Sequence, residues 1–216
     1  MKKKDKIIAL IVGSVILVLS IVLICFFSIP RIEYNYNKQL DCYYVNKAYG
    51  NAKEYEILDE INGKKVLYID EKAFMDKTNL ETIKMGSNIS KIERLAFTNC
   101  EKLKSIDLSK VMILERNAFM NCKSLVSVEL NATDILGGVF YDCTALVSVK
   151  LNNTLTIGTY AFTGTLIEEI IIPETVYSIG VDAFYNCVYL NKIVCKSNSL
   201  STNEYLLSLG KIVIFE

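Results

Sequence analysis

A phenylalanine, preceded by alanine in every copy but one, recurs through this chain at intervals of 21 to 23 residues. An aliphatic residue stands five positions before each phenylalanine, and a leucine or isoleucine stands five or six positions after it. One such unit cannot bury its own apolar residues, so successive units must stack on one another. The recurrence predicts an elongated repeat solenoid with one continuous core. Its phenylalanines are Phe74, Phe97, Phe119, Phe140, Phe162 and Phe184.

The whole unit follows the pattern V-x-x-I-x-x-x-A-F-x-x-C-x-x-L-x-x-I-x-L over roughly Asn51 to Lys196. This pattern closely resembles the BspA-type leucine-rich repeat, which is found in surface proteins of bacteria and some protists. The resemblance implies a leucine-rich-repeat solenoid of the α/β class, with six β-rich, short-strand repeats of about 22 residues. It also implies that the chain binds an extracellular protein or another cell-surface ligand.

The segment from Ile7 to Ile29 contains no charged residue. At about 1.5 Å per residue it is long enough to cross a hydrocarbon core of about 30 Å. Lysines precede it, so the positive-inside rule places the N-terminus in the cytoplasm and the rest of the chain outside. We therefore expect an uncleaved signal anchor and a single-pass protein of the cell membrane. A cleaved signal peptide and a lipoprotein acylated on Cys25 are the two alternatives.

Composition suggests further divisions along the chain. Polar residues rich in tyrosine and asparagine follow the apolar segment and suggest a stalk. The pair Asn62-Gly63 lies between two strand-like runs and predicts a tight hairpin turn within an N-terminal cap. The expected segments are a cytoplasmic basic tail (1–6), a transmembrane signal anchor (7–29), an extracellular stalk (30–50), a repeat domain with its N-terminal cap (51–197) and a C-terminal cap (198–216).

Charge and composition argue against several functions. The formal net charge is zero and the first six residues are basic, so the rest of the chain is mildly acidic, which argues against nucleic acid as a partner. The chain has no histidine, which removes the usual general base near neutral pH and the commonest metal ligand. We expect no catalysis, no cofactor, no bound metal and no small-molecule substrate.

The end of each repeat alternates outward and inward residues, as in Val128-Glu129-Leu130. A period of two indicates a short strand with one face in the core. Stacking would align these strands in a parallel ladder about 4.8 Å apart, with the outward residues in columns. These columns form the candidate partner-binding face, which we call the strand face. Its residues are Lys84, Asp107, Glu129, Lys150, Ile171 and Val194 in one column, and Ser105, Ser127 and Ser148 in the next.

Other interpretations of the strand face stay open. It could be a solvated surface that binds no ligand. Ile171 and Val194 stand where the first four repeats carry charge, so they could form an exposed apolar patch or be covered by the tail after position 197. We favour coverage by the tail.

Most of the cysteines belong to the repeat itself. Side chains in one column point in parallel, which disfavours disulfides, and a straight row cannot offer four thiolates to zinc tetrahedrally. The row is therefore predicted to contain buried free thiols that pack as small apolar groups. Cys42 and Cys195 lie near opposite ends, roughly 30 Å apart, and cannot pair. The row consists of Cys100, Cys122, Cys143 and Cys187.

Two functions fit these observations. The first, implied by the resemblance, is an anchored extracellular module that binds a macromolecular partner in adhesion. The second is a structural envelope or scaffold component that interacts with membrane proteins of the same cell.

Overall fold

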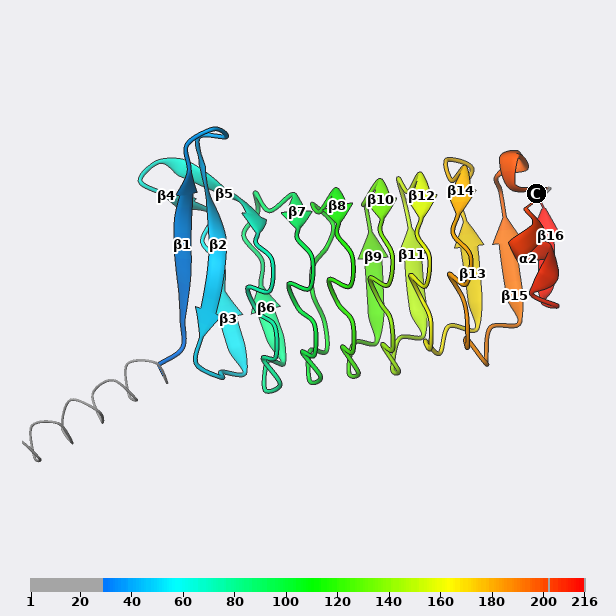
Figure 1. Cartoon of the computed structure of the whole chain (residues 1–216), viewed down its shortest axis with the longest axis horizontal. Helices are drawn as coiled ribbons and strands as arrows, with labels where there is room; N and C mark the ends of the chain where they lie inside the picture. The colour runs from blue at the N-terminus through cyan, green and yellow to red at the C-terminus, as the bar shows by residue number, and fades with distance from the viewer. Residues whose placement is uncertain (1–28, 202, 216) are drawn as a thin grey trace, which may run out of the picture.

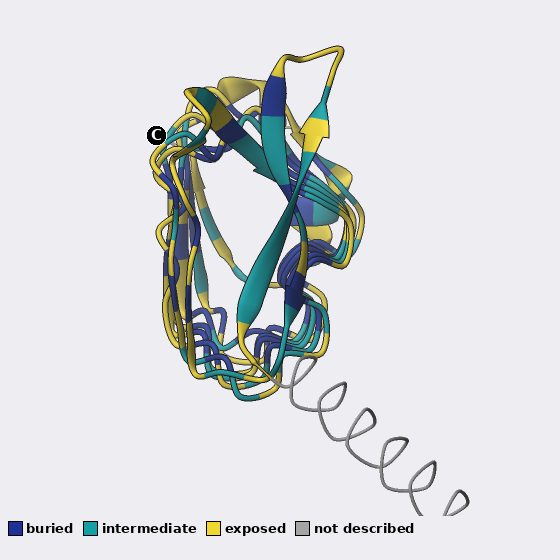
Figure 2. Ribbon diagram, turned by 90° about the vertical axis from the view of Figure 1, so that its left-hand side faces the viewer, coloured by how far each residue is buried: buried dark blue, intermediate teal, exposed yellow. Residues whose placement is uncertain are grey.

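The computed structural model describes residues 29–201 and 203–215, and these form one solenoid. Successive repeats lie side by side along the long axis of the molecule, from β1 (Arg31–Asn37) at one end to β16 (Ile212–Phe215) at the other (Figure 1). Seen along that axis, the repeats superpose on a common outline, with the hairpin of β1 and β2 (Cys42–Tyr49) across its end (Figure 2). The predicted solenoid is therefore confirmed.

The longest sheet runs along one side of the solenoid and is parallel from its second strand onward. In each repeat a strand, of six residues in the first repeat and two in the others, carries the aliphatic residue found five positions before the phenylalanine. These residues pair in register, as Ile135 does with Leu114 and Ile157. We call this sheet the long ladder. Its strands are β1 (Arg31–Asn37), β2 (Cys42–Tyr49), β5 (Lys64–Ile69), β7 (Lys91–Ile92), β8 (Ile113–Leu114), β10 (Asp134–Ile135), β12 (Thr156–Ile157) and β14 (Ser178–Ile179).

The strands predicted at the repeat ends form a second, interrupted set of small parallel sheets, which we call the repeat-end ladder. The second repeat contributes only an isolated bridge between Thr82 and Ser105, so the ladder is broken there. Its strands are β3 (Glu54–Glu56) with β6 (Thr82–Lys84), β9 (Ser127–Leu130) with β11 (Ser148–Leu151), and β13 (Glu169–Ile172) with β15 (Lys192–Cys195) and β16 (Ile212–Phe215).

The two ladders are joined by tight turns that carry the phenylalanines. Among the described residues, helices occur only near the C-terminus, as η1 (Asn198–Leu200) and α2 (Glu204–Ser208). The expected α/β class is therefore wrong for the repeats, which form a β-solenoid. Two positions per repeat, two residues before and two after the phenylalanine, have positive φ, as at Asn117 (57°) and Asn121 (60°). These left-handed residues interrupt any helix and produce the turns.

The phenylalanines form the centre of the core. Consecutive rings are stacked nearly parallel, with centroids 4.9 to 5.7 Å apart and interplanar angles of 4° to 8°. At the N-terminal end, Tyr55 meets Phe74 edge to face and closes the stack. The row is fully buried except at its last member, which is 3% exposed. Core packing, as predicted, accounts for this aromatic row.

The N-terminal cap begins earlier than predicted. Residues 30–50, expected to be a stalk, instead contain the antiparallel pair β1 and β2, and β2 joins β5 in the long ladder. Cys42, Val45 and Ala48, at every third position of β2, are buried beneath the first repeat, and the pairing of β2 with both β1 and β5 is interrupted by register shifts. The predicted hairpin turn is present between β4 (Glu60–Ile61) and β5, since Asn62 and Gly63 both have positive φ.

The C-terminal residues close the other end of the core. Strand β16 extends the repeat-end ladder beyond β15, and Leu200 and Leu206 are buried against the last repeat. The side chain of Asn203 caps α2 by accepting a hydrogen bond from the amide of Leu206 at 2.9 Å. Leu207, from the same helix, is exposed.

The predicted signal anchor, residues 7–29, lies outside the described residues except for its last position. Within the described residues, no helix has the length and apolar character needed to cross a membrane.

Candidate partner-binding surfaces

The predicted strand face exists as outward side chains on the repeat-end ladder. Glu129 is in register with Lys150, and Ile171 is in register with Val194. Lys84 is the last residue of β6. The second repeat, which has no strand in the repeat-end ladder, separates β6 from β9. The structure thus brings the predicted residues together in pairs, rather than in one unbroken column.

Most of the charges on this face are paired with neighbours along the ladder. The Nζ atom of Lys84 lies 2.5 Å from Glu56 Oε1, and that of Lys150 lies 2.8 Å from Glu129 Oε1. The hydrogen bond from Lys150 lowers the pKa of Glu129, and the bond to Glu56 raises the pKa of Lys84. Exposed ion pairs of this kind contribute about 0–1 kcal/mol. A partner can therefore rearrange them at little cost.

Asp107 is exposed and lies outside any strand. Its Oδ1 accepts a hydrogen bond from the backbone amide of Ser109 at 2.9 Å, and bonds from Ser109 lower the pKa of the carboxyl. The carboxylate thereby stabilises the turn that replaces a strand in the second repeat.

The two aliphatic residues of the strand face differ in exposure. Val194 is only 6% exposed because it lies between Ile171 and Ile214 in a three-stranded sheet, so the tail covers it as we favoured. Ile171 is 50% exposed, and coverage by the tail is wrong for this residue. Val194 therefore cannot be an outward contact, whereas Ile171 can.

The three serines of the strand face are all exposed. Ser127 and Ser148 are in register on β9 and β11, and Ser105 is bridged to Thr82. Because serine side chains are short, they leave the surface of the repeat-end ladder accessible to a partner. The face therefore combines hydroxyls, paired charges and one exposed isoleucine.

The cysteine row is buried and unbridged. All six cysteines of the described residues are free and buried. Burial raises the pKa of Cys100 to about 12 and the pKa of Cys122 well above its ordinary value. Among the described residues, no group of three or more Asp, Glu, Cys or His side chains is arranged to hold a metal. The row thus has a packing role.

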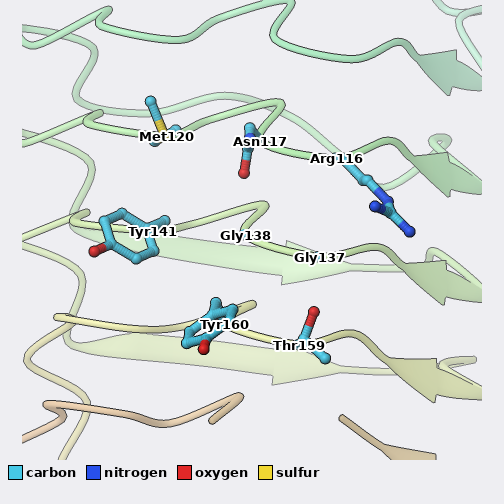
Figure 3. A pocket seen from close by; sticks show the side chains of 8 residues that line it. All are labelled: Arg116, Asn117, Met120, Gly137, Gly138, Tyr141, Thr159 and Tyr160. Carbon is cyan, nitrogen blue, oxygen red and sulfur yellow. The ribbon is translucent and has the colours of Figure 1, made fainter. Parts of the chain in front are cut away.

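A groove on the turns was not predicted from the sequence (Figure 3). It is open, has a volume of about 560 Å³ and spans the third, fourth and fifth repeats. The sequence signal was the pair Gly137-Gly138, which replaces two side chains present in the other repeats. The remaining lining residues are Arg116, Asn117, Met120, Tyr141, Thr159 and Tyr160.

Comparisons with known proteins agree with this architecture. The family model described as the BspA type leucine rich repeat region matches six copies over residues 51–165 and 155–213. Among solved structures, the fold is similar to a leucine rich cell surface protein from Faecalibacterium prausnitzii A2-165, with 24% identity and a TM-score of 0.63 over 79% of this chain and 55% of that one. The chain thus spans about half the length of that protein.

A second similar structure is the leucine rich repeat protein of T. pallidum, with 22% identity and a TM-score of 0.55 over 76% of this chain and 68% of that one. At these identities the likeness concerns the fold alone. No curated protein matches the sequence.

Proposed function

Because this chain belongs to the BspA-type leucine-rich repeat family, we propose that it is a membrane-anchored extracellular module that binds a macromolecular partner through its strand face. Repeat solenoids offer extended surfaces of this kind for recognition. Their stacked turns build the surface from residues that the core does not constrain. The family supplies the scaffold, and the outward residues supply the specificity.

The exposure of Ile171 beside a row of hydroxyls and ion pairs is the observation that supports binding most. An isoleucine that is 50% exposed on β13 lies one repeat from the Glu129–Lys150 pair. Interfaces commonly place an apolar anchor at the centre and polar groups around it. Ile171 is therefore proposed as the anchor, with Lys84, Asp107, Glu129, Lys150, Ser105, Ser127 and Ser148 as polar contacts.

Extracellular location is part of the proposal. It rests on the apolar segment 7–29 with lysines before it, and on the positive-inside rule. One structural neighbour is described as a cell surface protein, which is consistent with this location.

Binding of the full chain in phosphatidylcholine nanodiscs to immobilised fibronectin, fibrinogen and whole cells tests this function. Ile171→Lys should weaken binding at least about tenfold, since a loss of about 1.4 kcal/mol corresponds to that factor. Combined Glu129→Gln and Lys150→Gln should weaken it less, because both side chains are exposed and already paired.

A matched control removes a similar ion pair elsewhere. Lys123 and Glu101 form an exposed pair at 2.7 Å outside the repeat-end ladder. Changing both to Gln should leave binding unchanged. Equal losses in the control and in Ile171→Lys would exclude the strand face. If the parent chain binds none of these ligands but co-purifies with membrane proteins of its own cell, the envelope-scaffold function replaces the adhesive one.

A further inference from the structure

The groove on the turns exists because one repeat lacks two side chains. Three residues before the phenylalanine, the other five repeats carry Glu71, Arg94, Arg116, Thr159 and Val181, whereas the fourth carries Gly137. Gly138 follows at a position with positive φ (67°), where glycine is also the least strained residue. The groove therefore lies at the fourth repeat, and the third and fifth repeats form its walls. These two repeats are two inter-strand spacings apart, which makes the groove about 9.6 Å wide. That width suits a single ring-sized group.

One end of the groove holds a cation with no carboxylate partner. The guanidinium of Arg94, one repeat earlier, lies 2.6 Å from Glu71. Arg116 has no carboxylate within 4.0 Å among the described residues, and the next position in its column is Gly137. Arg116 and Thr159 flank Gly137 from the neighbouring turns (Figure 3). An arginine fork beside a hydroxyl is suited to a carboxylate.

The other end of the groove is aromatic and apolar, with Met120, Tyr141 and Tyr160. Tyr160 is exposed, and the charge of the nearby Asp182 carboxylate raises the pKa of its phenol. Because the side chain is exposed, its ring is available to a ligand. Asp182 belongs to the repeat beyond the groove, so its charge lies on the side opposite Arg116.

The backbone beneath the groove is already used within the solenoid. The amide of Gly138 donates to the carbonyl of Thr159 at 2.9 Å, and the amide of Asn117 donates to the carbonyl of Gly137 at 3.0 Å. These groups are not free to pair with the main chain of an extended peptide. Recognition must come from side-chain amide, hydroxyl, guanidinium and phenol groups. Those groups match a ring that carries several hydroxyls and one carboxylate.

We propose that this groove binds an acidic sugar residue, with the carboxylate on Arg116 and the sugar ring between the side chains of Tyr141 and Tyr160. Asn117 and Thr159 are positioned to bond ring hydroxyls. This site lies on the turns and not on the strand face, so it is independent of the proposed protein-binding function and can be tested separately.

The test follows the methyl signal of Met120 by NMR in the full chain, labelled at its methionine methyl groups and held in phosphatidylcholine nanodiscs. The titrants are trigalacturonic acid, its methyl ester and an acidic tripeptide, acetyl-Asp-Tyr-Asp. Trigalacturonic acid should shift Met120 but not Met75, which holds the same repeat position in the first copy. The methyl ester should bind at least tenfold more weakly, because it lacks the charge.

Two variants and a matched control complete the test. Arg116→Gln should weaken binding of the acid at least tenfold, whereas Arg94→Gln, in the same column outside the groove, should not change it. Gly137→Thr should abolish binding by restoring the missing side chain, and circular dichroism should show that the fold is retained.

Several results would overturn the proposal. They are no shift of Met120 by the acidic sugar up to about 10 mM, equal binding of acid and ester, unchanged binding in Arg116→Gln, or preferential binding of the tripeptide. The last outcome would assign the groove to a peptide partner.

Discussion

The thiol of Cys122 donates a hydrogen bond to the backbone carbonyl oxygen of Phe97, 3.3 Å away in the preceding repeat. The cysteine row therefore does more than fill space, because each thiol connects its own turn to the turn before it. A small side chain with a weak donor suits a site where a larger polar group would not fit. The same inter-repeat bond joins Cys100 to Phe74, Cys143 to Phe119 and Cys187 to Phe162.

The buried thiols should be unreactive in the native protein. Thiolates are the reactive form, and burial both blocks the reagent and raises the pKa of Cys100, Cys122 and Cys187. In a Cys25→Ser background, Ellman's reagent at pH 8 should label none of the six described cysteines. All six should react after unfolding in urea. Rapid labelling of the row in the folded protein would contradict this assignment.

The raised thiol pKa values also predict a loss of stability at alkaline pH. A thiol at 9.0 when unfolded and at about 12 in the folded state, as for Cys100, binds more protons when folded throughout that interval. Its stabilising contribution is complete below pH 9 and is lost as the pH rises toward 12. Urea midpoints at pH 8 and pH 10.5 should differ less in Cys100→Ala than in the parent. Equal differences would show that other groups, such as the buried tyrosines, account for the effect.

Removing one ring from the phenylalanine stack should destabilise the whole solenoid. Phe119 lies 5.1 Å from Phe97 and 5.5 Å from Phe140, and its side chain is fully buried. Phe119→Ala should cost about 3–5 kcal/mol, because the cavity cannot collapse between two fixed repeats. Urea unfolding followed by circular dichroism measures this cost. A cost below about 1 kcal/mol would mean that the repeats pack independently of the stack.

Much of the fold could be predicted because burial imposes a period on the sequence. Phenylalanine and the aliphatic positions recur wherever the core requires them, which identified the solenoid, its six copies and the buried cysteines. The long ladder was missed because a strand of two residues, such as Ile113–Leu114, is too short to show alternation. The hairpin of β1 and β2 was mistaken for a stalk because its many tyrosines and asparagines obscured the apolar face.

The candidate surfaces were less predictable for a related reason. Outward residues are free to vary, so the repeat pattern contains no information about ligands. The register of the strand face followed from period two, but the ion pair between Lys84 and Glu56 crosses 28 positions and depends on the stacking. The groove results from the two side chains that are missing at Gly137 and Gly138. Their absence creates a groove only when the neighbouring turns are in place.

Substituting glycine at a turn position with positive φ should increase the free energy of unfolding. Lys72 is exposed with φ of 59°, so Lys72→Gly relieves about 1–2 kcal/mol of backbone strain and loses about 0.5–1 kcal/mol through the freer unfolded chain. A net gain of about 0.5–1 kcal/mol is expected in urea unfolding. Gly138→Ala should act in the opposite direction, because φ is positive and a new Cβ would collide with Asn117 Oδ1. Destabilisation by Lys72→Gly would show that the strain at this position is negligible.

At Gly158 the repeat pattern and the structure conflict. The first four repeats carry a side chain at this position, so an alignment of the copies suggests that Ala or Glu would be accepted. In the fifth repeat, however, a Cβ would lie 2.6 Å from the amide nitrogen of Gly137 and 2.9 Å from the carbonyl oxygen of Ile135. These are backbone atoms of the adjacent turn, so they can move only if the repeats separate.

Gly158→Ala should therefore destabilise the protein by about 1–3 kcal/mol, at the upper end of that range. Gly137→Ala is the matched control, since its Cβ would meet the Thr159 hydroxyl at 3.1 Å, which can rotate away, and the Thr159 carbonyl oxygen at 3.2 Å, a much looser approach than the 2.6 Å at Gly158. The control should cost less than about 1 kcal/mol in the same urea titration. Equal costs for the two variants would mean that the loss reflects glycine replacement in general and not the close approach of the fourth and fifth repeats.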